Sequence, residues 1–335
     1  MSTLRPTVTI ATRDYDYVAA LALGDVAAEG IDLVLVRSFD ALDRFRDDPA
    51  VHGGEVSFSQ YVHRIAAGDR SLIGLPVFIM REFRQRCFFV RGDSGLTEAA
   101  QLSGRRVATD AWAASGNTWS RALLRERGVA LDSIRWLVGP VDPGDRSRPA
   151  DVLPAGVEPA PKGRALSELL LAGEIDAIMC PWPPRAFHEP GSRIVRLYRD
   201  YRSAERDYYR RTGIYPAHHI VALRKELIAP HRWIVASVFN AFVQARARSE
   251  QSHRVLHESS PWLLADLEEQ DALMGKGFRP YGYRENRAMV AAFCDEQAAQ
   301  VRRPHGYETS QLVDRFRARA HSCSARGRAT FRFVP

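Results

Sequence analysis

The sequence predicts an α/β protein that ends in a helical portion. Short apolar runs with the character of buried strands alternate with helical patterns over residues 8–223. From Pro230 onward, strand signals largely disappear and three long amphipathic helical stretches follow. A chain of 335 residues exceeds one ordinary domain, so two lobes are the natural expectation.

The expected strands are runs of β-branched and aliphatic residues bounded by turn signals. They cover residues 8–11, 31–36, 55–58, 73–78, 87–90, 106–109, 134–138, 175–180 and 219–223, with a further extended segment at 195–201. Pro76 places the fourth strand at a sheet edge or at a bend, because proline has no N–H to donate to a ladder.

The expected helices lie between these strands and after them. They cover residues 15–23, 38–46, 59–67, 97–102, 119–127, 166–171, 203–211, 234–247, 263–274 and 285–300. The segment 139–161 contains six prolines and is therefore expected to be mostly loop.

The charge of the chain favours anion recognition over nucleic-acid binding. The formal net charge of +7 is carried almost wholly by arginine, whose planar fork holds carboxylates and phosphates. The base composition of a genome can produce the same bias. The arginines are scattered, and the densest basic stretch is the C-terminal tail at 315–332. We therefore expect no nucleic-acid partner.

The N-terminus and the cysteines indicate a cytoplasmic protein. The first residues lack the apolar core and cleavage site of a secretory signal, and no run approaches the roughly 20 apolar residues of a membrane span. The four cysteines lack metal-ligand spacing and indicate buried or free thiols in a reducing compartment. No membrane partner is expected, and a homo-oligomer is left open.

The segment 208–223, YYRRTGIYPAHHIVAL, carries the strongest functional signal. Basic and aromatic residues lead into a Thr-Gly break, a proline and two histidines at the start of an apolar strand. His218 and His219, next to cationic and phenolic side chains, suit a site for an anionic and aromatic molecule. The alternative is that both are satisfied histidines of the core or of a strand edge.

Two helix starts that follow strands can hold a carboxylate or a phosphate. Helix N-termini present unpaired N–H groups and a partial positive charge, although ordinary capping explains each start equally well. The GxxxxGK[ST] pattern of a P-loop is absent. The candidate residues are Ser59 and Gln60 at the first helix, and Ser115, Gly116, Asn117 and Thr118 at the second.

Three further segments carry candidate ligand contacts. Arg81 and Arg84 can grip a carboxylate, unless their segment is a solvated loop with a surface Arg–Glu pair. Arg13 and Asp14 follow the first strand, where the crevice of an α/β sheet usually lies, although Asp14 can instead cap the next helix. Trp182 lies beside two prolines and can stack on a planar ligand or be an ordinary core residue.

A series of motifs occurs in order, at sensible spacing, between residues 8 and 300. They are GDVAAEGIDL, EVSFSQYVHRIAAGD, LPVFIMREFR, LSELLLAGEIDAI, YRSAERDYYRRTGIYPAHHIVALRKEL, PWLLADLEEQDALMG and FRPYGYRENR. Together they closely resemble the 4,5-dihydroxyphthalate decarboxylase-like proteins, which belong to the group with the type 2 periplasmic-binding-protein fold. The resemblance implies two α/β lobes with the ligand in the cleft between them. Residues 1–90 and 212–335, with the C-terminal helices, would form the first lobe, and residues 91–211 the second.

The family's named activity removes a carboxylate from a dihydroxylated aromatic diacid without an organic cofactor. The resemblance implies that Arg81 and the helix N-termini hold carboxylates, while a base such as His219 takes or shares a phenolic proton. An acid then protonates the ring carbon as carbon dioxide leaves. His219 aligns with the histidine that the family places after the TGI-aromatic-Pro run, and His218 is the less typical of the pair.

The chain departs from the family pattern in several places. Gln85 stands where a histidine commonly follows the Phe-Arg pair, and Trp182 stands where the family tends to carry an arginine. The SGNT helix start is also unlike the common version. A pocket with these changes recognises fewer charges, so a related aromatic acid as substrate, or a different reaction, is left open.

The predicted function is a cofactor-independent decarboxylase for a hydroxylated aromatic acid related to 4,5-dihydroxyphthalate. The alternative is a non-catalytic solute-binding protein for a small aromatic or anionic ligand, because this fold serves both. The missing secretory signal argues against that alternative, since a transport receptor must be exported. A bound metal is not predicted, although His218, His219, Asp14 and Asp16 could converge on one.

Overall fold

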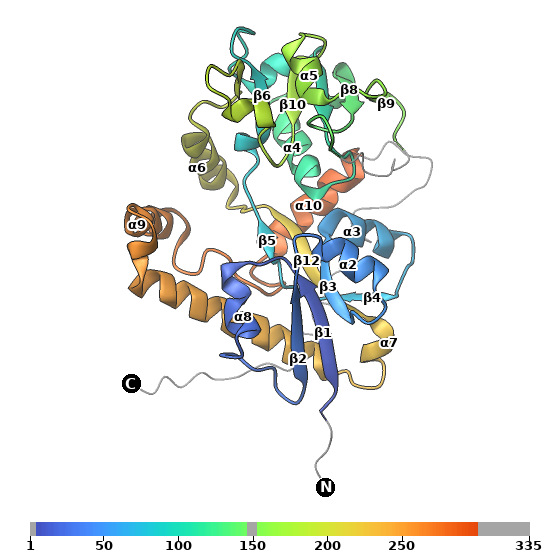
Figure 1. The fold of residues 1–335 in the computed structure, drawn as a ribbon, viewed down its shortest axis with the longest axis vertical. Helices are drawn as coiled ribbons and strands as arrows, with labels where there is room; N and C mark the ends of the chain where they lie inside the picture. The colour runs from blue at the N-terminus through green and yellow to red at the C-terminus, as the bar shows by residue number, and fades with distance from the viewer. Residues whose placement is uncertain (1–4, 146–152, 301–335) are drawn as a thin grey trace. The chain divides into compact units, whose positions relative to one another are not determined.

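The chain is divided into two compact α/β units. The computed structural model describes residues 5–145 and 153–300 (Figure 1). The first unit contains residues 5–81 and 217–291, and the second contains residues 82–216 and 292–300. The boundaries expected at 90/91 and 211/212 therefore lie at 81/82 and 216/217. The reason is that Phe88–Arg91 pairs with strands of the second unit, while a strand of the first unit begins at Ala217.

The first unit is built on a mixed sheet with the order β2-β1-β3-β12-β4, in which β5 also pairs with β12. β1 is parallel to β2 and β3, whereas β12 is antiparallel to β3, β4 and β5. The strands are β1 (Thr7–Thr12), β2 (Asp32–Arg37), β3 (Gly53–Ser57), β4 (Leu72–Gly74), β5 (Met80–Arg81) and β12 (Ala217–Arg224).

The expected buried strand at 219–223 is confirmed as part of β12. It lies between β3 and β4, and Ile220, Val221, Ala222 and Leu223 are fully buried. The strand expected at 73–78 is wrong beyond Gly74, where β4 ends. The cause is local, because Pro76 removes a ladder donor just after that point.

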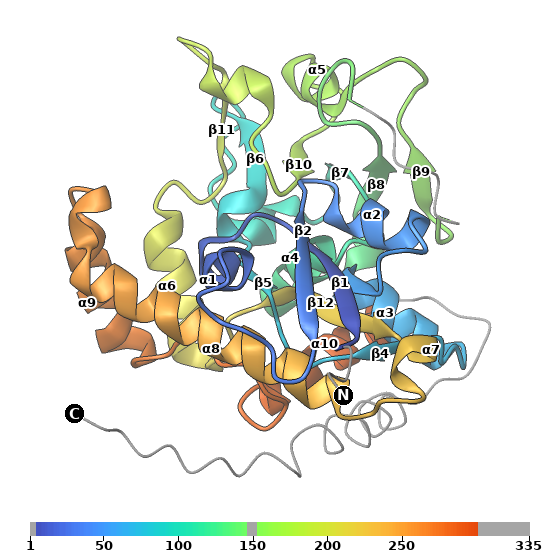
Figure 2. The same cartoon turned by 60° about the horizontal axis from the view of Figure 1, so that its bottom comes forward.

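The long helix α8 (Ile234–Val255) supplies one wall of the first core. It crosses the strands of this sheet (Figure 2), and its apolar side chains Ile234, Val238 and Phe242 pack with Val8 and Ile10 of β1. The region expected to be a helix at 15–23 forms a short 3₁₀ turn and one turn of α-helix. The other helices of this unit are η1 (Asp16–Val18), α1 (Ala19–Ala22), α2 (Ala41–Asp47), α3 (Phe58–Ala66), α7 (Lys225–Ile228), η6 (His257–Ser259) and α9 (Leu263–Met274).

The second unit contains a sheet with the order β11-β6-β10-β7-β8-β9. β9 lies within the segment expected to be loop, where it pairs with β8 at the edge of the sheet and so tolerates its terminal proline. The strands are β6 (Phe88–Arg91), β7 (Arg106–Thr109), β8 (Arg135–Val138), β9 (Val157–Pro159), β10 (Ala177–Met179) and β11 (Ile194–Arg196).

The second unit has two hydrophobic cores. One includes Val107, Leu124 and Trp136. The other includes Ala108, Leu166 and Ile178. The helices of this unit are η2 (Gln85–Cys87), η3 (Ala99–Leu102), α4 (Ser115–Glu126), η4 (Leu131–Ser133), α5 (Leu166–Leu171), η5 (Arg185–His188) and α6 (Tyr201–Thr212).

The last helix, α10 (Arg287–Gln300), begins in the first unit, and its residues from 292 onward belong to the second. The expectation that the C-terminal helices all pack on the first lobe is therefore wrong for these residues. Within residues 5–145 and 153–300, no helix combines the length and the apolar character that a membrane crossing requires.

Gly54 provides a test of how tightly β3 is packed. A Cβ atom at this position would lie 2.8 Å from the backbone oxygen of Ala11 and 2.8 Å from Cβ of buried Phe45. We expect Gly54→Ala to lower the free energy of unfolding by about 1–3 kcal/mol, because a rigid core resists an added methyl group. The measurement is urea unfolding.

The matched control is Gly92→Ala, where the nearest atom to an added Cβ is 3.6 Å away. This change should stay within about 0.5 kcal/mol of the parent protein. Equal unfolding midpoints for the two variants would contradict the packing that the structure shows.

Candidate functional site

In the first unit, the site is built around His219 on β12. His219 lies directly across from Ser57 of β3, and Glu55 lies two residues before Ser57 on that strand. Residues two apart on a strand share one face of the sheet, so Glu55 and His219 are diagonal neighbours on the same face. Nδ1 of His219 is 2.9 Å from Oε2 of Glu55.

Glu55 is fully buried and is the centre of a small hydrogen-bond network. The backbone N–H of Arg13 donates to Oε1, and the hydroxyl of Tyr15 donates to Oε2 at 3.0 Å. A buried carboxylate is costly unless it is paired, and these contacts supply the pairing. The sequence reasoning missed Glu55. A usable signal was present, because an acidic residue inside an otherwise buried strand is rarely tolerated without a partner.

Tyr15 acts as a hydrogen-bond donor in this network. Burial raises the pKa of Tyr15 well above its usual value, and the negative charge of Glu55 raises it further. The phenol therefore keeps its proton. Its ring stacks on Tyr17 at 4.9 Å, and the hydroxyl of Tyr17 donates to the backbone oxygen of Ile79. The loop after β1 is thus fixed to β3 and to the segment before β5.

The two histidines occupy different environments. His218 lies at an irregularity in the pairing of β12 with β5, whereas His219 is paired with Ser57 of β3 and with Met80 of β5. His218 is 3% exposed, whereas the side chain of His219 is 13% exposed. Of the pair, His219 is therefore the more accessible to a ligand.

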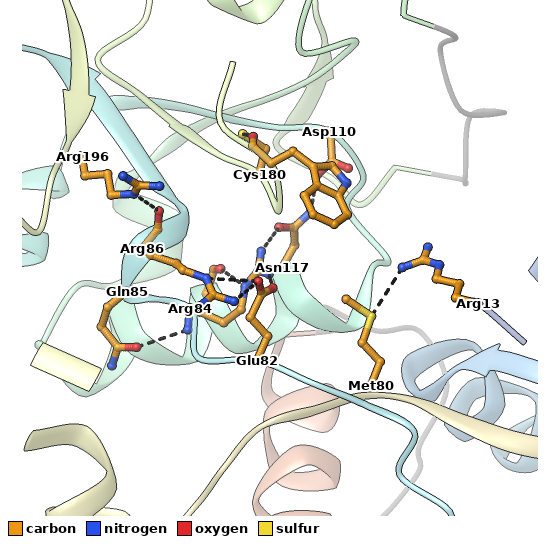
Figure 3. Close-up of polar contacts among 12 residues, drawn as sticks. Arg13, Met80, Glu82, Arg84, Gln85, Arg86, Asp110, Asn117, Cys180 and Arg196 are labelled. Carbon is orange, nitrogen blue, oxygen red and sulfur yellow. Dashed lines mark hydrogen bonds and ion pairs between the residues drawn. The ribbon is translucent and has the colours of Figure 1, made fainter. Parts of the chain in front are cut away.

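The other candidate residues of the first unit each contact a different partner. Asp14 is exposed and forms an ion pair with Arg37 at 2.7 Å. The guanidinium of Arg13 contacts the sulfur of Met80 at 3.6 Å (Figure 3). Ser59 is buried with its hydroxyl 2.9 Å from that of Ser57. The helix expected to open at Ser59 begins one residue earlier, at Phe58.

Arg81 and Gln60 also have defined positions in this unit. The guanidinium of Arg81 donates to the backbone oxygen of Pro280 at 3.0 Å and to the side-chain oxygen of Asn286. These bonds tie β5 to the segment that precedes α10. Gln60 is exposed in the first turn of α3.

In the second unit, Arg84 is the centre of a buried polar cluster (Figure 3). Its side chain is 2% exposed, and Nη1 donates to Oε2 of Glu82 at 2.9 Å. Nε donates to the hydroxyl of Ser120 at 3.2 Å, and Nη2 donates to Oδ1 of Asn117 at 3.5 Å. The alternative of a solvated loop with a surface ion pair is therefore wrong, because this pair lies inside the unit.

Gly116 explains how the arginine fits against α4. A Cβ atom at this position would lie 2.9 Å from both Cζ and Nη1 of Arg84. Glycine therefore permits the guanidinium to lie on the first turn of the helix. Asn117 Nδ2 donates to Oδ1 of Asp110 at 2.8 Å and to the backbone oxygen of Ala111 at 2.7 Å. The structure thus brings Arg84, Gly116 and Asn117 together.

The remaining candidates of this unit lie around that cluster. α4 begins at Ser115, which is buried, and the hydroxyl of Thr118 accepts from Gln297 at 2.9 Å. Gln85 is buried, and its side-chain oxygen accepts from the backbone N–H of Arg84. Trp182 is 56% exposed and is therefore not a core residue.

The cysteines are not arranged as nucleophiles. Cys87, Cys180 and Cys294 are buried and free. Burial raises the pKa of the Cys87 thiol to about 11 and also raises that of Cys180. A thiolate is therefore disfavoured at either position. Cys323 lies outside the described residues.

A metal site at the histidine pair is not formed. Throughout the described ranges, no group of three or more His, Cys, Asp or Glu side chains is placed to hold a metal ion. Asp16, which was considered together with Asp14 and the histidine pair, instead lies 3.0 Å from Nε2 of His253. Asp16 therefore does not converge with the histidine pair.

The fold can now be compared with known structures. A Candida albicans protein described as exhibiting the generic periplasmic-binding-protein structural fold aligns with a TM-score of 0.52 at 13% sequence identity. The alignment covers 94% of this chain and 95% of that protein. This likeness, together with the two α/β units, defines a protein of the periplasmic-binding-protein fold and confirms the predicted fold class.

The sequence comparison identifies the family. A 4,5-dihydroxyphthalate decarboxylase of Comamonas testosteroni is 31% identical over 304 residues, which are 88% of this chain and 92% of that protein. A protein of the same name from Pseudomonas putida is 32% identical over 215 residues, or 61% and 81% of the two chains. The chain belongs to the 4,5-dihydroxyphthalate decarboxylase family. No family model matches the sequence.

Glu205 on α6 gives the second unit a pH-dependent stability. Burial raises the pKa of Glu205 from 4.5 to about 7, and the positive charge of Arg86 opposes the shift only in part. The folded unit therefore favours the neutral carboxyl. Its contribution to stability is fully present below about pH 4.5 and is lost as the pH rises through about 7.

We expect Glu205→Gln to raise the free energy of unfolding at pH 8 by up to about 3 kcal/mol, at ~1.36 kcal/mol per pKa unit. At pH 4.5 the change should be small, because the native side chain is then neutral. Urea unfolding at the two pH values measures the difference. Glu189→Gln, at an exposed carboxyl, is the control. A gain that is equal at both pH values would contradict the assignment.

Proposed function

We propose that the protein is a decarboxylase, a carbon–carbon lyase, that acts on a hydroxylated aromatic carboxylic acid related to 4,5-dihydroxyphthalate. The observation that supports it most is the hydrogen-bonded His219 in a chain that is 31% identical to a 4,5-dihydroxyphthalate decarboxylase over 304 residues. A histidine is suited to this reaction because it can take and return protons near neutral pH.

The proposed reaction needs one proton acceptor and one proton donor. His219 takes or shares the proton of a ring hydroxyl, which raises the electron density of the ring. The ring carbon that bears the carboxylate then accepts a proton. The carbon–carbon bond breaks as carbon dioxide leaves, and the electron pair of that bond restores the aromatic ring. The phenol regains its proton, so the net reaction exchanges a carboxylate for a hydrogen and consumes one proton.

Taken separately, each unit contains groups of the kind that bind a carboxylate. In the first unit we propose the guanidinium of Arg13 and the first turn of α3. In the second unit we propose the first turn of α4, beside the guanidinium of Arg84, and the exposed ring of Trp182 for stacking. Arg81 already donates hydrogen bonds to Pro280 and Asn286. We therefore propose that it contributes positive charge and does not form a bidentate hydrogen-bond pair with a substrate carboxylate.

A second candidate function is ligand binding without chemistry. It is favoured by the likeness to a structure that exhibits the generic periplasmic-binding-protein fold. In that case the same groups would bind a small aromatic or anionic molecule, and His219 would act as a hydrogen-bonding group only.

Carbon dioxide release separates the two functions. Purified protein is incubated with a panel of hydroxylated benzoic and phthalic acids, and gas release is followed together with the aromatic product. For at least one hydroxylated acid, we expect one molecule of carbon dioxide to be released for each molecule of acid that loses a carboxylate. Acids without a hydroxyl should release no carbon dioxide. Tight binding without turnover across the panel would reject the decarboxylase and support the binding protein.

His219→Ala is expected to lower kcat by at least about 100-fold, because general acid–base catalysis contributes a factor of about 10²–10⁴. Circular dichroism should show an unchanged fold, since β12 keeps its backbone pairing. His253→Ala is the control, because His253 lies on α8 in the same unit and pairs with Asp16 at the start of η1. Near-normal kcat in His219→Ala would remove this histidine from the mechanism.

A further inference from the structure

We propose that Glu55 is a positioning residue that holds His219 in the tautomer with hydrogen on Nδ1 and thereby leaves Nε2 as the proton acceptor. This inference rests on the proposed function of His219 as the acid–base group. It assigns a role to a buried carboxylate that does not itself meet the substrate.

The first argument is the rigidity of the contact. Glu55 lies on β3 and His219 on β12, and each of these strands is hydrogen-bonded on both sides within the sheet. The distance between the two backbones is therefore fixed by the ladder. The 2.9 Å contact between Nδ1 and Oε2 does not depend on a loop.

The second argument is the direction of the hydrogen bonds. The backbone N–H of Arg13 can only donate, and it is directed at Oε1 of Glu55. The hydroxyl of Tyr15 donates to Oε2, and burial keeps that phenol protonated by raising its pKa. A carboxyl proton on either oxygen would compete with these donors. Glu55 is therefore an acceptor, and Nδ1 of His219 must carry the hydrogen that lies between them.

The third argument is accessibility. Glu55 is completely buried, so a ligand cannot reach its oxygens. The side chain of His219 keeps 13% of its surface exposed. With Nδ1 occupied by Glu55, Nε2 is the ring nitrogen available to take a phenolic proton. The carboxylate then stabilises the imidazolium that forms, because an opposite charge favours the protonated ring.

The alternative is that Glu55 is only structural and that His219 is an incidental third neighbour. Glu55 would then serve to satisfy the N–H of Arg13 and the hydroxyl of Tyr15. Both roles predict a loss of stability when Glu55 is changed, so stability cannot separate them. The tautomer of His219 can separate them.

The test uses Glu55→Gln, which preserves size but replaces one acceptor oxygen with a donor. We expect kcat to fall by about 100-fold while KM changes by less than about 3-fold, as for loss of a group that acts on the acid–base step. ¹⁵N NMR of the His219 ring should lose the single Nδ1–H tautomer.

Two further variants separate the roles. Tyr15→Phe removes one donor from Glu55 but leaves the contact with His219, so the tautomer of His219 should stay as in the parent protein. Asp16→Asn breaks a second carboxylate–histidine pair of the unit, with His253, and should leave kcat within about 2-fold. The ring signals of His219 are assigned by comparison with the spectrum of His219→Ala, in which they are missing.

The outcomes are distinct for the inference and for the proposed function. An Nε2–H tautomer of His219 in the parent protein overturns the inference, even if Glu55→Gln fails to fold. A folded Glu55→Gln in which His219 keeps the same tautomer also overturns it, however far kcat falls. Full activity in His219→Ala instead overturns the acid–base role of His219, and the NMR measurement still reports on the carboxylate–histidine contact.

Discussion

The first unit depends on one buried negative charge. Glu55 joins three separate parts of the chain: the loop after β1, its own strand β3, and β12. In a low-dielectric interior each of these hydrogen bonds is stronger than it would be in water, and the loss of any one leaves an expensive unpaired group. The same carboxylate therefore maintains the sheet and orients the histidine, so a change at this position affects the stability of the unit together with the orientation of the ring.

The second unit is organised around a buried positive charge. Arg84 is paired with Glu82 and is further held by Ser120 and Asn117. A buried ion pair gains little net stability, because both charges lose their hydration. The pair instead fixes the geometry of the cluster, because the guanidinium lies where Gly116 leaves room on the first turn of α4.

Most of the secondary structure could be predicted from the sequence. Of the contact between His219 and Glu55, only His219 was predicted. Apolar runs bounded by turns placed β7, β8 and α5 almost at their observed limits, and the family resemblance singled out His219. Glu55 was not predicted, because its hydrogen-bond partners lie 42, 40 and 164 residues away along the chain. Periodicity describes which face a residue occupies, not which distant donor meets it. For the same reason, the sequence did not distinguish a ligand-binding Arg84 from an Arg84 in a surface ion pair.

The placement of β12 has a consequence for how the chain is made. β4 is joined to its sheet only through β12, and β3 has β12 as its second neighbour. The sheet of the first unit is therefore incomplete until residue 224 has left the ribosome, although its other strands are synthesised before residue 82. Throughout that interval the nascent chain carries unpaired strand edges, which favour aggregation. Synthesis of the intervening 135 residues, 82–216, thus separates the two halves of the first unit in time, and a chaperone that shields those edges would raise the yield of folded protein.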